Sequence, residues 1–485
     1  MNLKVISRNV GTALLVSALF MFLSIIVSVM NGNDSALAAL IISFTITFIV
    51  GIFPFIFVRK TSAITMKDGY LVIVLSWLLS FIFGMLPYAL WGGPFSIIDA
   101  WFESVSGYTT TGATILANVE ALPNSLLFWR ASTHFIGGLG VVVFLLLIIP
   151  NAAPVRLRLT NMELSSLSRS GYRSRTNKTI VIFSSVYLGL VLASFVCYKI
   201  AGMSWLDAIC HAFSVSATGG FSTRNFSIAS FNSLPITLIS MVFMLLASMH
   251  FGMVFFAVVT RSLKPLNNPI LKVYLSYLCM FSIIAALVLK NGNYAATWGQ
   301  AILDGSFQML SYASTTGFAT ADNSNWPYFL SLLIMFAGTV CGMAGSTTGG
   351  LKTDRIVLLS RLLVANIKES IHPNSVHEVH IGGTVVSRDN IYPHVMYIAM
   401  FFVVWIISAI LSMVVGGGME TSLMATLSSL GNVGPSVGDV GTFGNYGLLP
   451  AFSKFVYTVD MFLGRVEMYP VLAVLYLLFN PEKKF

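Results

Sequence analysis

The chain repeats one pattern four times along its 485 residues: an apolar segment, a short segment with an acidic residue near its start, a turn centred on glycine, and a second apolar segment. The four turns occupy residues 109–113, 217–221, 314–318 and 431–435. Asp99, Asp207 and Asp304 each precede the glycine of the following turn by 13 residues, and Glu420 precedes Gly434 by 14. Self-similarity of this kind indicates a repeat architecture. Four re-entrant loops can close a ring around one axis, so the pattern predicts a pore.

The composition excludes a soluble globular protein. Hydrophobic residues make up 56% of the chain and charged residues only 9%, whereas a soluble domain carries about 25% charged residues. A membrane span needs roughly 20 apolar residues. Ten segments are long enough: 10–30, 36–58, 70–91, 126–149, 179–201, 234–260, 271–289, 327–362 (interrupted), 393–415 and 450–479. We therefore expect an all-α integral membrane protein with ten transmembrane helices.

The net charge of +9 is distributed as the topology of a membrane protein predicts. Ten spans place both termini on one side, and most of the 27 Lys and Arg residues fall on that side, with a cluster at 156–178. The positive-inside rule then makes the termini cytoplasmic and turns the glycine turns outward. The cluster is either this topology signal or a surface for an anionic partner or lipid; nucleic acid is not expected as a partner. The first span is too long for a signal peptide and is expected to be retained.

The short segments before the turns predict a cation site. A helix of 12 residues is about 18 Å long, so each segment enters and leaves the membrane on the same side. Its C-terminal end carries partial negative charge into the membrane, and non-helical backbone is tolerated there only in protein or beside water. The turns are therefore expected to offer carbonyl oxygens that replace the hydration shell of an ion. These carbonyls belong to Thr110, Thr111, Thr218, Gly219, Thr315, Thr316, Asn432 and Val433, and the turn glycines are Gly112, Gly220, Gly317 and Gly434.

Three segments resemble a known family. Residues 102–114 read FESVSGYTTTGAT, residues 217–223 read ATGGFST and residues 345–350 read GSTTGG. They resemble the bacterial TrkH potassium-uptake proteins of the Trk/Ktr/HKT superfamily, and the resemblance covers essentially the whole chain. It implies four units of span, pore helix and span around one pore, after two extra N-terminal helices. The boundaries are then 1–66 for the extension and 67–152, 153–263, 264–366 and 367–485 for the units.

The same resemblance implies a biological setting. The protein would take up K⁺ across the bacterial inner membrane as a homodimer in lipid, gated by a cytoplasmic nucleotide-binding tetramer called TrkA. No covalently bound cofactor is implied, and K⁺ is the transported ion. The chain has no phosphate-binding Gly-x-x-x-x-Gly-Lys motif, so a nucleotide would act only through the partner. In that family a Ser at the first filter glycine is associated with Na⁺ permeation; all four positions here are Gly, which favours K⁺.

The segment 327–362 contains a candidate gate. Small residues run from Ala344 to Gly349, and alone they are typical of a helix-packing face. Six in succession nevertheless oppose a continuous helix, so we expect a polar loop beneath the turns. By resemblance this loop is an intramembrane gate. Its residues are Ala344, Gly345, Ser346, Thr347, Thr348, Gly349 and Gly350.

Arg465 lies within an apolar segment, where a guanidinium facing lipid is costly. One interpretation is a local pair with Glu467 or Asp460, although neither has the spacing of neighbours on a helix face. The other is a pore-facing side chain. By resemblance, Arg465 would lie below the turns, contact the gate loop and oppose resident cations.

Other polar residues have structural interpretations. Asp99, Asp207, Asp304 and Glu420 are expected to cap their short helices. Glu103, His211 and Gln308 each follow the acidic residue by four positions and are expected to brace the helices by hydrogen bonds. His372, His377 and His380 are interpreted as loop residues, with zinc as the alternative.

Two other classes of protein are weaker alternatives. A secondary transporter of organic solutes would show inverted repeats and intramembrane carboxylates, whereas these repeats run in the same direction. A membrane enzyme would need a positioned acid, base, metal or nucleophile, and the histidines here are isolated. The sequence therefore favours a transport protein over an enzyme.

Overall fold

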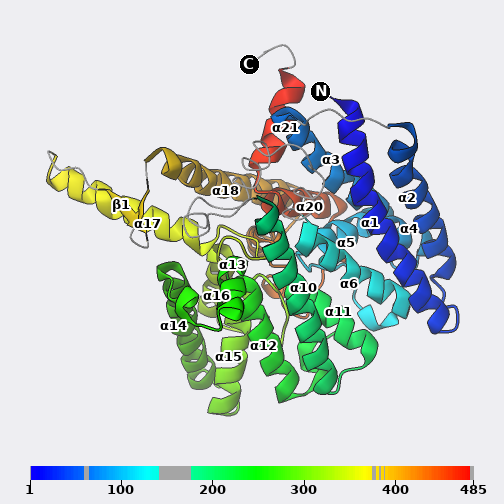
Figure 1. Ribbon diagram of the computed structural model, residues 1–485. Helices are drawn as coiled ribbons and strands as arrows, with labels where there is room; N and C mark the ends of the chain where they lie inside the picture. The colour runs from blue at the N-terminus through cyan, green and yellow to red at the C-terminus, as the bar shows by residue number, and fades with distance from the viewer. Residues whose placement is uncertain are drawn as a thin grey trace.

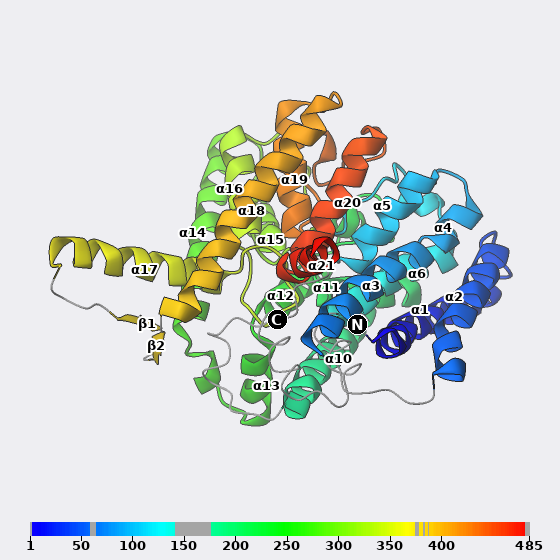
Figure 2. The ribbon, with the colours of Figure 1, turned by 90° about the horizontal axis from the view of Figure 1, so that it is seen from above.

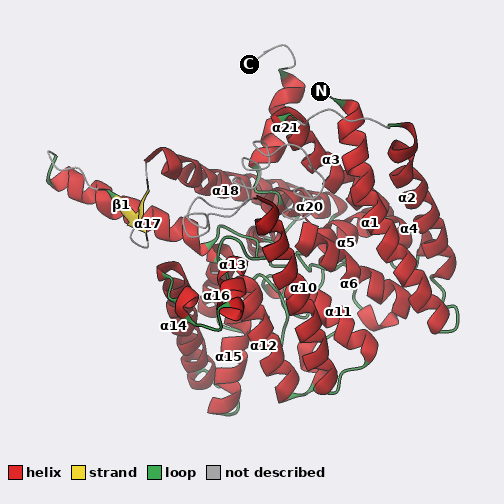
Figure 3. Ribbon diagram, in the orientation of Figure 1, coloured by secondary structure: helices red, strands yellow, loops and turns green. Residues whose placement is uncertain are grey.

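The computed structural model describes residues 2–58, 65–140, 176–373, 378–381, 384–386 and 388–480, and helix dominates this part of the chain (Figures 1 and 3). The helices are α1 (Leu3–Met30), α2 (Leu37–Phe57), α3 (Met66–Gly84), α4 (Leu86–Trp91), α5 (Ile97–Tyr108), α6 (Asn124–Leu139), α10 (Thr176–Ile200), α11 (Trp205–Ser216), α12 (Leu234–Ser248), α13 (Phe251–Val259), α14 (Pro269–Asn291), α15 (Trp298–Ala313), α16 (Tyr328–Val340), α17 (Thr353–Ile371), α18 (Arg388–Val414), α19 (Met419–Gly431), α20 (Ala451–Arg465) and α21 (Tyr469–Phe479). Short 3-10 helices lie at Val119–Ala121, Ser227–Phe231, Lys264–Leu266 and Gly438–Val440. An antiparallel hairpin of β1 (Val379–Ile381) and β2 (Thr384–Val386) is a small departure from the expected all-α class.

The apolar helices confirm a helical membrane protein. Six helical stretches in the described residues are long and apolar enough to cross a membrane: α1, α2, α3 with α4, α10, α14 and α18. Two bent pairs, α12 with α13 and α20 with α21, raise the number to eight. The expected count of ten also included 126–149, which continues beyond the described residues after α6, and 327–362, which is divided into α16 and α17.

In each repeat a second apolar segment follows the turn, and more of these segments are interrupted than the sequence predicts. The interruption expected in 327–362 is the loop between α16 and α17, residues 341–352. The uninterrupted spans expected at 234–260 and 450–479 are wrong, because these pairs bend by 106° and 107°. At the second bend Glu467 and Met468 have φ angles of 62° and 53°. Non-glycine residues seldom adopt this left-handed conformation, so the residue types at the bend did not indicate it. The pattern of apolar residues did not indicate it either, because it continues across the bend.

The repeats are arranged as a cycle. Each short helix (α5, α11, α15 or α19) packs against the helices before and after it in the chain. In addition, α6 packs on α11, α12 on α15, α16 on α19, and α20 on α5. Each second helix therefore contacts the short helix of the next repeat, and the fourth repeat returns to the first. The central axis of this cycle is where the four turns meet.

Other elements surround this core. The pair α1 and α2 packs on the first repeat, with α1 against α3 and α6. The start of α1 and the end of α21 lie on the same side (Figure 1). Large hydrophobic side chains are exposed along α2, α14 and α18, for example Phe53, Ile283 and Ile410, as a lipid-facing surface requires. In two views, α17 projects away from the other helices (Figures 1 and 2).

Capping explains where most of the short helices begin. Ser96 and Ser204 are the N-caps of α5 and α11, and each hydroxyl accepts a hydrogen bond from the backbone of Asp99 or Asp207. The prediction that the carboxylates themselves are the caps is therefore wrong. Asp99 and Asp207 lie in the first turn behind their serine caps, and Glu420 lies in the first turn of α19, whose N-cap is Gly418. Asp304 lies beyond the first turn, because α15 begins after its N-cap Thr297. Asp304 instead accepts a hydrogen bond from Thr320.

Candidate functional site

The four turns share one backbone conformation. In every copy a non-glycine residue with positive φ is followed, two residues later, by a glycine with positive φ. The first set has φ of 52° (Thr110), 53° (Thr218), 51° (Thr315) and 54° (Asn432), and the glycines have 80° (Gly112), 85° (Gly220), 75° (Gly317) and 97° (Gly434). Left-handed angles at non-glycine residues are uncommon, so their recurrence at one register establishes four equivalent turns, the divergent fourth included.

One backbone hydrogen bond recurs at all four turns. The donors are the backbone N–H groups of Thr111, Gly219, Thr316 and Val433, and the acceptors are the carbonyls of Ser106, Ser214, Ser311 and Ser428, each at 2.9 Å. A serine therefore lies six residues before every turn glycine. This register is visible in the sequence and strengthens the repeat, although our sequence analysis did not use it.

The turns close into a ring through their glycines. Gly112 lies against the carbonyl oxygen of Gly219, Gly220 against that of Thr316, Gly317 against that of Val433, and Gly434 against that of Thr111. A Cβ atom on any of the four would fall less than 3.0 Å from that oxygen. Glycine is thus required both for φ and for the approach of the next turn. The contacts run in one direction from the first turn to the fourth and back to the first.

A cavity of about 200 Å³ opens onto this ring, and all four turn glycines line it. Arg130 and Arg224 also line the cavity. Each pairs with a carboxylate of a short helix: Arg130 with Glu103 at 2.6 Å and Arg224 with Asp207 at 2.8 Å. Both arginines that line the cavity are therefore balanced by carboxylates, which lowers the electrostatic barrier to entry of a cation.

The predicted bracing of the short helices is present. Glu103 accepts hydrogen bonds from the Thr114 hydroxyl at 3.0 Å and from the backbone N–H of Ile115 at 3.1 Å. His211 Nε2 and Ser222 Oγ share a hydrogen bond of 2.9 Å. Gln308 Nε2 donates to the carbonyl of Ala321 at 3.0 Å. Each side chain ties its short helix to the segment that follows the turn.

The 341–352 loop contacts the turns, and none of its residues lines the cavity. Thr347 Oγ1 donates to the carbonyls of Ser216 and Ala247, at 3.1 and 3.2 Å, in the second repeat. The backbone N–H of Gly349 donates to Thr315 Oγ1 in the third turn at 3.1 Å. Gly349 also lies so close to Asn432 that a Cβ atom would collide with it. The expected residues 344–350 therefore adjoin three of the four repeats.

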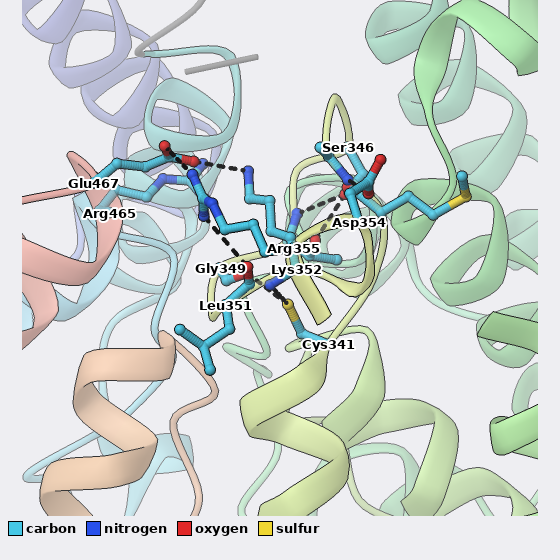
Figure 4. Close-up of polar contacts among 12 residues, drawn as sticks. Cys341, Ser346, Gly349, Leu351, Lys352, Asp354, Arg355, Arg465 and Glu467 are labelled. Atoms are coloured by element: carbon cyan, nitrogen blue, oxygen red, sulfur yellow. Dashed lines mark hydrogen bonds and ion pairs between the residues drawn. The ribbon is translucent and has the colours of Figure 1, made fainter. Parts of the chain in front are cut away.

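Arg465 links this loop to the first repeat. Its Nη1 donates to the carbonyl of Thr347 at 2.8 Å and its Nη2 to the carbonyl of Gly137 in α6 at 2.9 Å. The alternative partners are engaged elsewhere: Asp460 accepts from Ser408 at 2.7 Å, and Glu467 bonds to Arg355 (Figure 4). The predicted contact between Arg465 and the loop is present.

A buried ionic cluster beside the loop escaped the sequence analysis. Glu467 pairs with Arg355 at 2.6 Å and with Lys352 at 3.5 Å (Figure 4). The Arg355 guanidinium also stacks 4.1 Å from the ring centroid of Tyr397. Glu467 and Arg355 are 112 residues apart in the chain, so no local spacing could reveal the pair. The cluster joins the start of α17 to the bend between α20 and α21.

The structure describes two of the three predicted loop histidines and only the end of the basic stretch 156–178. His377 and most of the basic stretch 156–178 lie outside the described residues. His380 lies in strand β1 and not in a loop as predicted. Its side chain is exposed and lies 3.8 Å from the carboxylate of Glu378. Among the described residues, no group of three or more His, Cys, Asp or Glu side chains could hold a metal ion.

The chain matches known proteins over nearly its whole length. A family model described as TrkH, cation transport protein, matches residues 36–292 and 270–484. The Trk system potassium uptake protein TrkH of Halomonas elongata is 32% identical over 98% of this chain and 98% of its own. The protein of the same name from Vibrio parahaemolyticus is 30% identical over 98% of this chain and 99% of its own. The crystal structure of the potassium transporter TrkH from Vibrio parahaemolyticus superposes with a TM-score of 0.88 at 29% identity, covering 98% of this chain and 99% of that one.

Proposed function

The chain belongs to the TrkH family of cation transport proteins, and from this premise we propose that it takes up K⁺ through the centre of the ring of glycine turns. The observation that carries the proposal is the closure of that ring. Four equivalent turns meet around one axis, and each presents its glycine to the carbonyl of the next. A ring of backbone carbonyls suits a bare monovalent cation. No chemical step is required of the protein, which acts as a transporter and not as an enzyme.

Selection would occur at the carbonyl groups of the turns. These belong to Thr110, Thr111, Thr218, Gly219, Thr315, Thr316, Asn432 and Val433. Their positions are held by the serine hydrogen bonds and by the glycine contacts between turns. Because every turn is fixed by the next, the ring resists contraction around a smaller ion. This resistance supports preference for K⁺ over Na⁺.

Gating would occur at the 341–352 loop together with Arg465. The loop lies beneath the turns and is held by hydrogen bonds to the second and third repeats. Arg465 clamps it to α6 and adds a positive charge beside the route to the cytoplasm. Movement of the loop would remove both obstacles together. Residues 344–350 and Arg465 are therefore the gate in this proposal.

The proposed setting is the bacterial inner membrane, with both termini in the cytoplasm. Positive charge on the side of the termini supports this orientation. The proposed units are the extension at 1–66 and the repeats at 67–152, 153–263, 264–366 and 367–485. We propose gating by a nucleotide-binding cytoplasmic partner of TrkA type, because the similar proteins are named as members of a Trk system. The proposed homodimer rests on the resemblance of the sequence to that family.

The test is ion flux through the purified protein in liposomes. Wild type is expected to take up rubidium tracer against a K⁺-loaded interior and to give a reversal potential that follows K⁺ rather than Na⁺. Gly112→Ser should lower the K⁺/Na⁺ permeability ratio. Absence of cation flux from well-folded protein, with or without its partner, would exclude the proposed function.

A further inference from the structure

The second turn lacks an internal support that two of the others have. In the first turn the hydroxyls of Thr109 and Thr111 share a hydrogen bond of 2.8 Å, and in the third turn Ser314 and Thr316 do the same at 2.8 Å. The corresponding residues of the second turn are Ala217 and Gly219, which have no hydroxyl. The second turn must therefore be held in another way.

His134 occupies the space that a side chain at position 219 would fill. A Cβ atom on Gly219 would lie less than 3.0 Å from three atoms of the His134 ring. The φ angle of Gly219 is outside the left-handed region, so its backbone would accept a side chain if the ring were absent. Glycine at 219 is thus required by the bulk of His134. The imidazole comes from α6, the second helix of the preceding repeat.

The position of the His134 ring is fixed on two sides. Nδ1 shares a hydrogen bond of 3.1 Å with Ser214 Oγ, and the carbonyl of the same serine accepts the N–H of Gly219. The ring stacks on Phe221 with centroids 4.1 Å apart and planes 13° from parallel. Phe221 immediately follows Gly220, so His134 contacts residues before, within and after the turn. The side chain is fully buried.

The fourth turn shows the opposite arrangement of bulk. Its residue Val433 carries a side chain, and the facing residue of the preceding repeat is Gly338 in α16, where a Cβ atom would come within 3.1 Å of Val433. At the fourth turn the large residue, Val433, lies in the turn and the glycine lies in the helix. At the second turn the large residue, His134, lies in the helix and the glycine lies in the turn. At both junctions a large residue on one side is thus matched by a glycine on the other, as close packing requires.

We propose that His134 is a positioning residue that holds the carbonyls of the second turn and thereby sets the K⁺/Na⁺ selectivity of the ring. The inference rests on the proposed function, since it concerns the same ring. His134 does not touch the ion. Its ring replaces the hydroxyl pair of the first and third turns, and without it the second turn gains room to move while its neighbours stay fixed.

The test is a cycle of His134→Ala, Gly219→Ala and the double variant, with reversal potentials measured in liposomes. His134→Ala is expected to lower the K⁺/Na⁺ permeability ratio by roughly tenfold while cation flux persists. Gly219→Ala alone should lower both the K⁺/Na⁺ permeability ratio and the yield of folded protein, because its Cβ would collide with the imidazole of His134. In the double variant the Cβ enters the vacated space, and the ratio should return to within about threefold of wild type. The control is Gly189→Ala, whose Cβ meets nothing within 4 Å.

Rescue separates positioning from a general loss of stability, because two merely destabilising changes would add. A double variant no more selective than the worse single variant would overturn the inference, as would a wild-type ratio in His134→Ala. If either single variant cannot be purified in folded form, the K⁺/Na⁺ permeability ratio of the double variant decides alone. A ratio within about threefold of wild type supports the inference, and a lower ratio overturns it. If the wild-type protein itself conducts cations without preferring K⁺ over Na⁺, the proposed function is overturned, and this inference is overturned with it.

Discussion

The Cα atom of Gly434 packs against the carbonyl oxygen of Thr111, so the last turn of the chain closes on the first. Asn432 reinforces this closure, since its Nδ2 donates to Thr111 Oγ1 at 3.0 Å and to the carbonyl of Met461 at 2.8 Å. The turn that departs most from the others in sequence therefore makes the contacts that complete the ring. Its divergence reflects a particular role at the junction of the fourth and first repeats.

Serine at a turn glycine is expected to reduce selectivity. Gly112→Ser places a Cβ against the carbonyl of Gly219 and also strains a φ of 80°. The displaced carbonyl should lower the K⁺/Na⁺ permeability ratio by about tenfold or more. Because the fourth turn diverges in sequence, a milder effect is expected at Gly434 than at the other three glycines. The structure agrees with this ranking for Gly112 and Gly220, where the Cβ would come closer to a carbonyl than at Gly434, but not for Gly317, where it would lie farther from one.

Gly32→Ser provides the matched control for this series. Gly32 has a φ of 78°, but a Cβ there meets nothing within 4 Å. It therefore imposes similar backbone strain without a collision. Reversal potentials of Gly112→Ser and Gly32→Ser should differ clearly. Equal ratios in folded proteins would show that these turns do not select the ion.

Thr111→Val is expected to weaken the closure of the ring. Valine keeps the shape of the side chain but removes the oxygen that bonds both Thr109 and Asn432. Loss of these hydrogen bonds should lower the free energy of unfolding by about 1–3 kcal/mol. Thr316→Val is the control, because within the described part of the chain the Thr316 hydroxyl shares a hydrogen bond with Ser314 alone. Thermal unfolding in detergent should show the larger decrease for Thr111→Val; equal decreases would contradict the role of the Asn432 contact.

The sequence predicted the repeated turns and the loop beside them, and missed two helix bends and an ion pair between distant segments. Four turns at matched registers indicated a ring, and the run of small residues from Ala344 indicated the interruption after α16. The bends at Met249 and Glu467 were missed because they depend on backbone conformation at non-glycine residues inside apolar segments. The Arg355–Glu467 pair was missed because its partners are distant in the chain. Local pattern reveals an element, whereas contacts between repeats appear only once the helices are packed.

Removing one partner of the Arg355–Glu467 pair is expected to be strongly destabilising. Both side chains are buried, and an unpaired buried charge costs about 3–5 kcal/mol. Glu467→Ala should therefore lower the thermal unfolding temperature markedly. A double variant, Glu467→Gln with Arg355→Met, should recover part of the loss, because it removes the buried guanidinium together with its carboxylate. Of the cluster's charges only Lys352, which is less buried than Arg355, then lacks the Glu467 carboxylate. The exposed pair of Glu378 and His380 is the control, and Glu378→Gln should have little effect. A stable Glu467→Ala protein would show that this pair does not hold α17 to the bend.

Deletion of residues 344–350 is expected to raise basal K⁺ flux and to abolish its control by the cytoplasmic partner. The loop is tied to the second and third repeats by hydrogen bonds of Thr347 and Gly349, and in the proposed function it blocks the route below the turns. Flux should be measured in liposomes with and without the partner. Flux and regulation equal to those of wild type would show that the loop is not the gate.

Arg465→Ala is expected to increase conductance. Arg465 donates to the carbonyls of Thr347 and Gly137, so the change both releases the loop from α6 and removes a positive charge beside the ion route. Arg465→Lys separates the two effects: it keeps the charge but cannot span both carbonyls with a planar fork. Single-channel recording should show the highest unitary conductance in Arg465→Ala, whereas both variants should open more often than wild type. If Arg465→Ala lowers only the yield of folded protein and leaves conductance and opening unchanged, Arg465 serves packing between the repeats and does not control the passage of ions.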